Sequence, residues 1–483
     1  MLWHTVYRDK VLMPDYAFAG KHLAYHLLDA MTAHVRTVGR LPDAWVQENR
    51  AKIGALEHAL ARLRQEAVPA YAPEVPDLYF AFSAWLEAEL GPEAVSFLRL
   101  GLSRNDLDMT VYKMRTRELL LTLGGQLCGL RAEVLGKAEA HLDTLLIAHT
   151  HHQPGQPTTV AHYLAAIDGV LERDLERLLA AYGRLNTCPL GSAALAGSSY
   201  ALDRAYTAGL LGFAAPVANS YDAVASSDWQ VEFVSVVQSV ALNLSRLVCD
   251  LISWTSQGLF ELPDTLVQGS SIMPQKRNPI ALEHARTRFS RALGGSQTVL
   301  YSSHNIPYGD LNDFGPDIQG AIMSLFIQFE GGVALLTACV AEGDFDRRRL
   351  AELARATDTT ATELADWLTQ RHKLSFQQAH RLVGLLVREL RTLGRTPQSA
   401  TPEDLSALGG PALAVAEIQE ALDPLAFVRR RSGLGGPAPE VVHKHIQQAR
   451  HRLGETRDQL KELQAHLKEA RAFLLMTPGK DTV

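Results

Sequence analysis

The chain has 483 residues and a mass of 52.9 kDa, which is enough to bury a large core. Its 47% hydrophobic and 21% charged residues are typical of a soluble globular protein. The formal net charge of −6 gives no basic surplus for binding nucleic acid or an anionic membrane.

The N-terminal stretch MLWHTVYRDKVLMPDYAF has charges and a proline where a signal peptide needs an apolar run. The four cysteines form no CxxC pair, which disfavours a disulfide scaffold and a structural zinc site. A reducing compartment is then the default, and we expect a cytoplasmic protein.

Leucine- and alanine-rich segments at helical spacing recur along the whole chain, whereas the alternation typical of strands is scarce. The sequence therefore predicts an all-α fold. Short amphipathic helices, for example over 43–65, and the proline-bearing stretch VPAYAPEVPDL predict an N-terminal cap domain over residues 1–103.

Three longer apolar segments follow at 110–141, 227–260 and 317–341, and they predict a central bundle domain over 104–343. A helix of about 30 residues is on the order of 45 Å long, and a helix that is apolar on several faces must be covered on several sides. Polar residues interrupt the most apolar stretch, so a buried helix is favoured over a membrane span. Helices from a second copy would supply the missing cover, which predicts a homo-oligomer.

After Gly343 the composition becomes charged again, and the loops LGRTPQSATPED and SGLGGPAPE interrupt short helical segments. This pattern predicts a small C-terminal helical domain over 344–483. The final stretch, GETRDQLKELQAHLKEARAFL, is typical of an amphipathic packing helix with one solvated face.

Small, polar and cationic residues are concentrated in the loop GSSIMPQKRNP at 269–279. Asn278 and Pro279 are typical of a helix start, with asparagine as the cap and proline at the first helical position. The helix N-terminus and the charge of Lys276 would stabilise a bound carboxylate or the alkoxide of a loop serine such as Ser270. An ordinary surface turn would not require this particular set of side chains.

The loop resembles the signature of the fumarase/aspartase superfamily, whose members cleave a C–N or C–O bond beside a carboxylate and release fumarate. Gln275 is closest to the argininosuccinate lyase branch, which includes the delta-crystallins. Other stretches resemble that branch in the expected order, so the similarity covers nearly the whole chain. They are GLSRNDLDMT, THHQPGQPTT, PLGSAALAG, NSYDAV, ATELADWL, SFQQAHRLVG and GLGGPAPEVV.

The resemblance implies a three-domain fold whose long central helices form a shared bundle in a homotetramer. It also implies active sites that are each assembled from segments of three subunits. We expect no cofactor and no metal, because Lys276, Asn278 and backbone N–H groups can supply the charge stabilisation.

Elimination of an amine from an N-substituted aspartate requires removal of a weakly acidic proton next to a carboxylate, and the resulting dianion must be stabilised. Lys276 and Asn278 are suitable side chains for this stabilisation. By resemblance, Ser270 is the general base, with Ser271 as the competing candidate.

By resemblance, His151 protonates the leaving nitrogen, although His149 and His152 stand beside it in the sequence. Glu283 is expected to pair with His151, to orient its ring and to favour its protonated form. The remaining substrate-binding positions implied by the resemblance are Ser103, Arg104, Asn105, Thr150, Gln275, Tyr308 and Asn312.

Several departures from the family pattern fall on the side expected to hold the amine half, the part of the substrate that leaves with the nitrogen. We therefore hypothesise an N-succinyl compound other than argininosuccinate, with argininosuccinate itself as the close alternative. The departures are Lys21 in place of a serine, Tyr79 in place of a histidine, Leu102 in place of an arginine, Leu107 and Asn312 in place of glutamines, Ser227 in place of an arginine and Gly315 in place of a lysine.

Three other functions are disfavoured. Gln275 and the C-terminal stretches argue against an aspartase or an adenylosuccinate lyase. A non-catalytic structural relative would have no need to keep Ser270, His151, Lys276, Asn278 and Glu283 together. No basic face is found that would suit nucleic acid.

Overall fold

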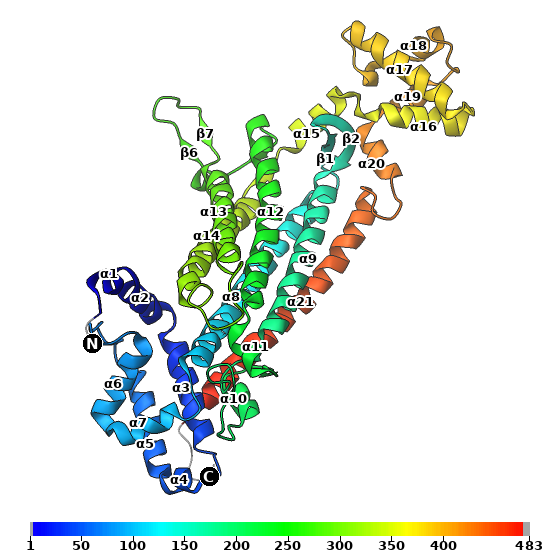
Figure 1. Ribbon diagram of the computed structural model, residues 1–483. Coiled ribbons are helices and arrows are strands. Elements are labelled where there is room, and N and C mark those ends of the chain that lie inside the picture. Colours follow the sequence, from blue (N-terminus) through cyan, green and yellow to red (C-terminus); the bar gives the residue numbers. More distant parts are fainter. Residues whose placement is uncertain (1–2, 477–483) are drawn as a thin grey trace.

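The computed structural model describes residues 3–476, and it is mostly helical, which confirms the predicted all-α class (Figure 1). The N-terminal part is a group of short helices at one end of the molecule. The expected helix at 43–65 is in fact two helices that meet at Asn49, where the backbone leaves the helical region (φ −107°, ψ 18°). These elements are α1 (Thr5–Tyr7), a π-helical turn (Arg8–Leu12), α2 (Met13–His22), α3 (Ala24–Val38), α4 (Ala44–Glu48), α5 (Arg50–Leu63), α6 (Leu78–Leu90) and α7 (Pro92–Ser96).

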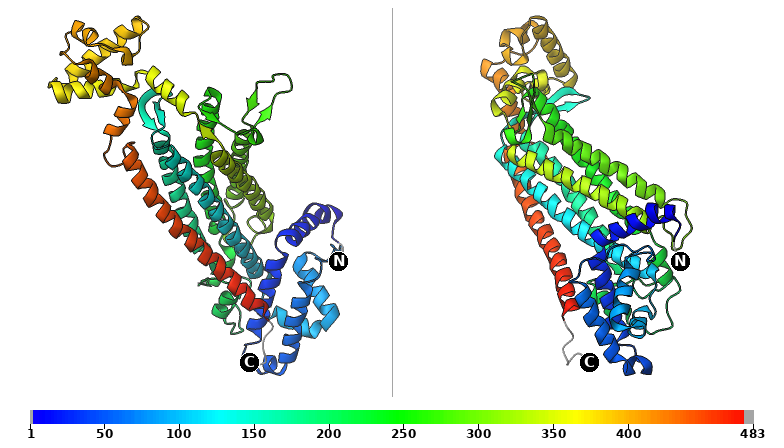
Figure 2. Two further views of the ribbon diagram at one scale, coloured as in Figure 1. Left: turned by 180° about the vertical axis from the view of Figure 1, so that it is seen from behind. Right: turned by 90° about the vertical axis from the view of Figure 1, so that its left-hand side faces the viewer.

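Long helices lie side by side in the middle of the molecule, as both views in Figure 2 show. The three predicted long segments correspond to α8, α12 and α14. At about 1.5 Å per residue, the 37 residues of α8 extend for about 55 Å. The bundle contains α8 (Arg104–Ala140), α9 (Val160–Leu185), α12 (Asp228–Gln257), α13 (Ile280–Ser302) and α14 (Pro316–Glu342), with the shorter α10 (Arg204–Leu210) and α11 (Ser220–Ala225) at one end.

Within residues 3–476, α12 and α14 are long and apolar enough to cross a membrane by length and composition alone. Half of the most apolar window of each helix is buried inside the chain, where α12 packs against α9 and α13, and α14 packs against α8 and α13. Large apolar side chains remain on their outer faces, including Leu242 (55% exposed) and Ile327 (50% exposed). The single chain therefore leaves these two helices partly uncovered.

Short strands also occur, and the sequence did not predict them. The described residues contain four two-stranded sheets, of which the hairpin of β1 (Leu145–Thr150) and β2 (Gln153–Thr159) is the largest. It was missed because LLIAHT resembles a helical segment and QPGQPTT contains two prolines. The other pairs are β3 (Thr187–Cys188) with β4 (Ala215–Pro216), β5 (Phe260–Glu261) with β8 (Asp344–Phe345), and β6 (Gln268–Gly269) with β7 (Arg277–Asn278).

The C-terminal part has a second hydrophobic cluster, built from side chains between Leu364 and Leu422, at the end of the bundle far from the N-terminal helices (Figure 1). The last helix, α21 (Pro439–Leu475), then returns along α8 and α9 (Figure 2, left). Gly124 of α8 lets it come close, because a Cβ there would meet Leu460 at 2.9 Å. The three-domain division stays a proposal. The intervening helices are α15 (Arg347–Ala356), α16 (Ala361–His372), α17 (Phe376–Thr392), α18 (Pro402–Ala407), α19 (Val415–Leu422) and α20 (Pro424–Arg430).

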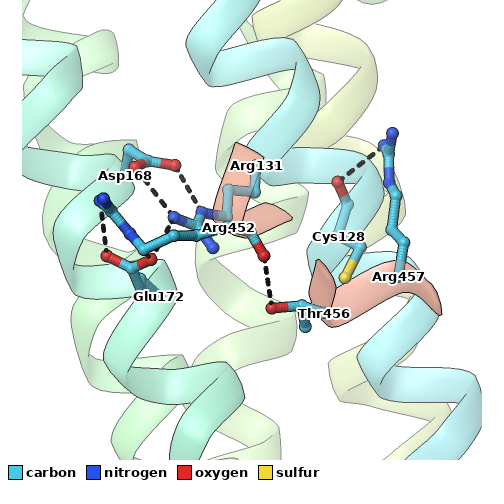
Figure 3. Close-up of polar contacts among 7 residues, drawn as sticks. All are labelled: Cys128, Arg131, Asp168, Glu172, Arg452, Thr456 and Arg457. Carbon is cyan, nitrogen blue, oxygen red and sulfur yellow. Dashed lines mark hydrogen bonds and ion pairs between the residues drawn. The ribbon is translucent and has the colours of Figure 1, made fainter. Parts of the chain in front are cut away.

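A buried ion network joins α8, α9 and α21 (Figure 3). The fully buried guanidinium of Arg131 donates to Asp168 Oδ1 at 2.6 Å, to Asp168 Oδ2 at 3.2 Å and to Glu172 Oε1 at 2.8 Å. Arg452 of α21 donates to the same Glu172 carboxylate at 2.6 and 3.1 Å. Charges removed from water are stabilised only when they are paired, so this network strongly constrains how the three helices pack.

We expect Asp168→Asn to lower the free energy of unfolding by about 3–5 kcal/mol, because it leaves the buried Arg131 charge only partly compensated. The measurement is the urea midpoint of the purified protein. Asp458→Asn is the matched control, since Asp458 is 71% exposed and, within residues 3–476, forms an ion pair only with Lys461, which is 73% exposed. Equal midpoints for the two variants would contradict the importance of the network.

Candidate active site

The N-terminus of α8 is held by a capping box and by a neighbouring loop. Ser103 is the N-cap, and its backbone N–H donates to Asp106 Oδ1 at 3.0 Å. The other oxygen of Asp106 accepts from the N–H groups of Gly191 (2.8 Å) and Ala193 (2.9 Å). Burial raises the pKa of Asp106 to about 7, and these backbone donors oppose the rise. Asp106 therefore fastens the loop PLGSAALAG to the start of α8.

A cavity of about 320 Å³ opens beside this helix start, between α2, the beginning of α6 and the loop that precedes α14. It brings together three of the predicted substrate-binding residues, Arg104, Asn105 and Asn312. The Arg104 guanidinium pairs with Asp77 and donates to both oxygens of Asp108 at 2.8 Å. The cavity therefore combines charged and apolar side chains on one wall of the bundle.

Tyr308 lies on the same loop as Asn312 but does not line the cavity, and it is 59% exposed. Its hydroxyl donates to Asp222 Oδ1 at 2.7 Å, and this hydrogen bond raises the pKa of Tyr308 to about 12. Its ring stacks on Tyr221 with a centroid separation of 5.9 Å. Ser103, the fifth predicted residue in this region, acts as the helix cap and also donates to Asn105 Oδ1 at 2.5 Å.

Thr150 and His151 lie at the tip of the β1/β2 hairpin. His151 and His152 both adopt left-handed backbone conformations (φ 52° and 61°), as the central residues of a type I′ two-residue turn do. Both side chains are exposed in the single chain. His149 and His152 line a second cavity, of about 760 Å³, whereas His151 does not, so the turn separates His151 from its histidine neighbours.

Ser270, Gln275 and Lys276 lie on an arm closed by the short β6/β7 pair, which projects from the bundle above α13 (Figure 1). The Ser270 hydroxyl oxygen accepts hydrogen bonds from the backbone N–H groups of Ile272 (3.3 Å) and Met273 (3.1 Å). These donors would stabilise negative charge on that oxygen. At the base of the arm, Arg277 donates to the carbonyl of Leu262 at 2.6 Å and pairs with Asp264.

The expected helix cap at Asn278 is wrong. Asn278 belongs to β7 and pairs with Gln268, and α13 begins at Ile280 with Pro279 as its N-cap. The physical reason is that the backbone of Asn278 is used in closing the arm, which is incompatible with the capping geometry. Glu283 lies in the first turn of α13.

The predicted site residues do not converge within one chain. The start of α8 and the hairpin that follows its end are separated by the length of that helix, about 55 Å, and the arm occupies a third position (Figure 1). Among the described residues no ion pair joins His151 to Glu283, and no group of three or more His, Cys, Asp or Glu side chains is arranged to hold a metal ion. The start of α8, the hairpin tip and the arm are each ordered by contacts with neighbouring residues.

Five aspartates line the cavity and none was predicted as a site residue; two of them bind Arg104. Asp77 is the N-cap of α6, accepting from the Phe80 N–H at 3.1 Å, as well as a partner of Arg104. Asp108 stands four residues after Arg104 on α8. That spacing is a sequence signal for a helical ion pair and could have identified Asp108.

Comparisons with known proteins agree on one group of enzymes. The family described as Lyase matches residues 81–294, and the family described as Argininosuccinate lyase C-terminal matches residues 358–429. Argininosuccinate lyase 2 of Agrobacterium fabrum is 36% identical over 93% of this chain and 90% of its own length. The argininosuccinate lyase of Halorhodospira halophila is 37% identical, and the match covers 83% of this chain and 87% of that one.

A solved structure of an EDDS lyase variant with bound fumarate superposes with a TM-score of 0.84 at 27% identity. The match covers 99% of this chain and 95% of that one.

We expect Asp106→Asn to loosen the loop at 189–197. The two carboxylate oxygens of Asp106 accept from the N–H groups of Ser103, Gly191 and Ala193, whereas an asparagine amide has only one accepting oxygen. Leaving a buried donor unpaired costs about 1–3 kcal/mol. Hydrogen exchange of peptides that contain Gly191 and Ala193 should become faster, whereas Asp458→Asn should leave it unchanged. Unaltered exchange in Asp106→Asn would mean that this carboxylate does not hold the loop.

Proposed function

The chain belongs to the argininosuccinate lyase family of carbon–nitrogen lyases that eliminate fumarate, and we propose that its substrate is an N-succinyl amino compound. The observation that carries the proposed chemistry is the geometry of the arm. Two backbone N–H groups are directed at the Ser270 oxygen, and a lysine and an asparagine follow in the same segment.

In the proposed first step, the Ser270 alkoxide removes a proton from the carbon next to the succinyl carboxylate. The electron pair of the broken C–H bond moves into that carboxylate, and Lys276 and Asn278 stabilise the dianion through charge and hydrogen bonding. Stabilising the alkoxide makes serine available as a base near neutral pH, which the N–H groups of Ile272 and Met273 favour.

In the proposed second step, the dianion collapses, the bond between carbon and nitrogen breaks, and fumarate forms. His151 gives a proton to the departing nitrogen, so that a neutral amine leaves. The hairpin turn presents His151 outward at its tip, where it can reach a substrate held by another segment. Glu283 is the proposed partner that orients the ring and favours its protonated form.

We propose that the site is completed between copies in a homotetramer that works in the cytoplasm. The length of α8 keeps Arg104 and His151 of one chain too far apart to contact one small substrate. The uncovered apolar faces of α12 and α14 support the same conclusion, since they need helices from other copies.

The amine half is proposed to occupy the cavity at the start of α8. Ser103, Arg104, Asn105 and Asn312 belong to this region, with Tyr308 beside it and Thr150 and Gln275 supplied by other copies. Gly315 lines the cavity where a lysine is usual, and a Cβ there would come within 3.0 Å of the Leu311 carbonyl. The glycine at this position, together with the other departures from the family pattern, favours an amine half other than arginine. The names and 36–37% identities of the relatives favour argininosuccinate as the second candidate.

Replacing the proposed base should remove activity. We expect Ser270→Ala to lower the rate of fumarate release by about 10²–10⁴-fold, the usual contribution of a general base. The measurement follows fumarate by its ultraviolet absorbance with argininosuccinate and a panel of N-succinyl amines. Ser271→Ala is the matched control and should keep most of the activity. A larger loss in Ser271→Ala than in Ser270→Ala would mean that Ser271 is the general base.

Mixing two inactive variants tests whether the site is shared. Some sites in a mixed oligomer of Ser270→Ala and His151→Asn would combine an intact Ser270 with an intact His151 from different copies. Asparagine is chosen because it tolerates the left-handed backbone at position 151. We expect partial recovery of fumarate release after the two proteins are dissociated together and reassembled.

The control mixture is Ser270→Ala with Lys276→Ala, because these residues lie on the same arm and no site could then receive both intact side chains. Recovery in this control, or none in the first mixture, would contradict the shared site.

A further inference from the structure

The cavity at the start of α8 is acidic, and we infer that it takes an amine half bearing a second, distal cation and no carboxylate. This inference rests on the proposed function, because it concerns the amine that leaves with fumarate. It narrows the substrate class from N-succinyl amines in general to N-succinyl derivatives of a diamine or a similar dication.

The charge of the cavity wall is strongly negative. Among the described residues, Arg104 is the only basic side chain that lines it, and this charge is already paired with Asp77 and Asp108. The remaining carboxylates form no salt bridge within residues 3–476. The aspartates of the cavity wall are Asp15, Asp77, Asp108, Asp310 and Asp317.

The uncompensated carboxylates come from different elements that face one another. Asp15 lies on α2, and Asp317 lies in the first turn of α14. Burial raises the pKa of Asp15, and the charge of Asp317 raises it further. Burial also raises the pKa of Asp310, against a hydrogen bond from Asn105 and the charge of Arg104. A cation between Asp15 and Asp317 would relieve their repulsion.

A second observation points to a ligand. Tyr112 of α8 lines the cavity and is only 5% exposed, yet its hydroxyl makes no hydrogen bond to any described residue. The hydroxyl is open to the cavity and is free to bond a group held there. An ammonium group has three N–H donors and could bond the Tyr112 oxygen and two carboxylates together.

The rest of the lining suits an aliphatic chain between the two nitrogens. Leu23, Leu27, Met109 and Val111 contribute apolar surface to the same cavity. A carboxylate on the amine half would find no uncommitted cation on this wall and would face several like charges. The cavity therefore favours a short alkyl diamine and rejects the corresponding amino acid.

The test uses the reverse reaction, the consumption of fumarate by the purified full-length protein in the presence of matched amines. Diaminobutane and butylamine differ only in the distal cation, whereas ornithine is diaminobutane with an added carboxylate. Agmatine and arginine form a second pair that differs only in the carboxylate. We expect kcat/KM to be higher by about tenfold or more for diaminobutane than for butylamine or ornithine, and for agmatine than for arginine. Higher kcat/KM for arginine or ornithine would overturn the inference.

Variants of the cavity link the preference to these carboxylates. Asp15→Asn and Asp317→Asn should each reduce the ratio of kcat/KM for diaminobutane to that for butylamine by about tenfold. The exposed Asp458→Asn should leave this ratio unchanged. An unchanged ratio in both cavity variants would show that the selectivity arises elsewhere and would overturn the assignment.

Failure of this inference and failure of the proposed function give different results. Turnover of arginine but not agmatine would keep the lyase and overturn the charge selection. If no amine is turned over, calorimetric titration of diaminobutane and ornithine into the same protein decides the question. Binding of diaminobutane alone would keep the acidic cavity while removing the lyase function, and binding of neither would overturn both.

Discussion

The length of α8 is the constraint on which the rest of the structure depends. This helix carries the polar cavity at its first residues and leads into the histidine hairpin after its last. The Arg131 network holds α8 against α9 and α21, and α8 is one continuous helix of 37 residues, so its two ends lie far apart within one chain. A small substrate can meet both ends only if two copies lie alongside each other, as our proposal requires.

Backbone hydrogen bonds and backbone conformation position the proposed functional residues more than side-chain packing does. Ser270 receives N–H groups from its own turn, and Asp106 holds a loop from elsewhere in the chain through two N–H groups. The hairpin tip depends on two residues in left-handed conformations. The hairpin turn leaves the side chains of His151 and His152 exposed in the single chain and available to another copy.

The long helices could be predicted because their apolarity extends over many turns, and the resemblance of the 269–279 loop indicated the enzyme class. Asp106 could not be recognised as a clamp, because its partner N–H groups belong to residues more than 80 positions away. The hairpin was missed because His151–His152 is not one of the usual turn pairs such as Asn-Gly. Asn278 was misread as a cap because its competing strand partner, Gln268, is not signalled by any local pattern.

The return of α21 along α8 has a consequence for how the chain is made. Leu460 fits against Gly124, and Arg452 joins the ion network of a helix formed more than 300 residues earlier. While the ribosome is still adding the last helix, that side of the bundle remains open and the Arg131 network lacks its third helix. This side of the bundle is therefore covered only after α21 has been made, and a chain cut short before residue 439 would expose the surfaces of α8 and α9 that α21 buries.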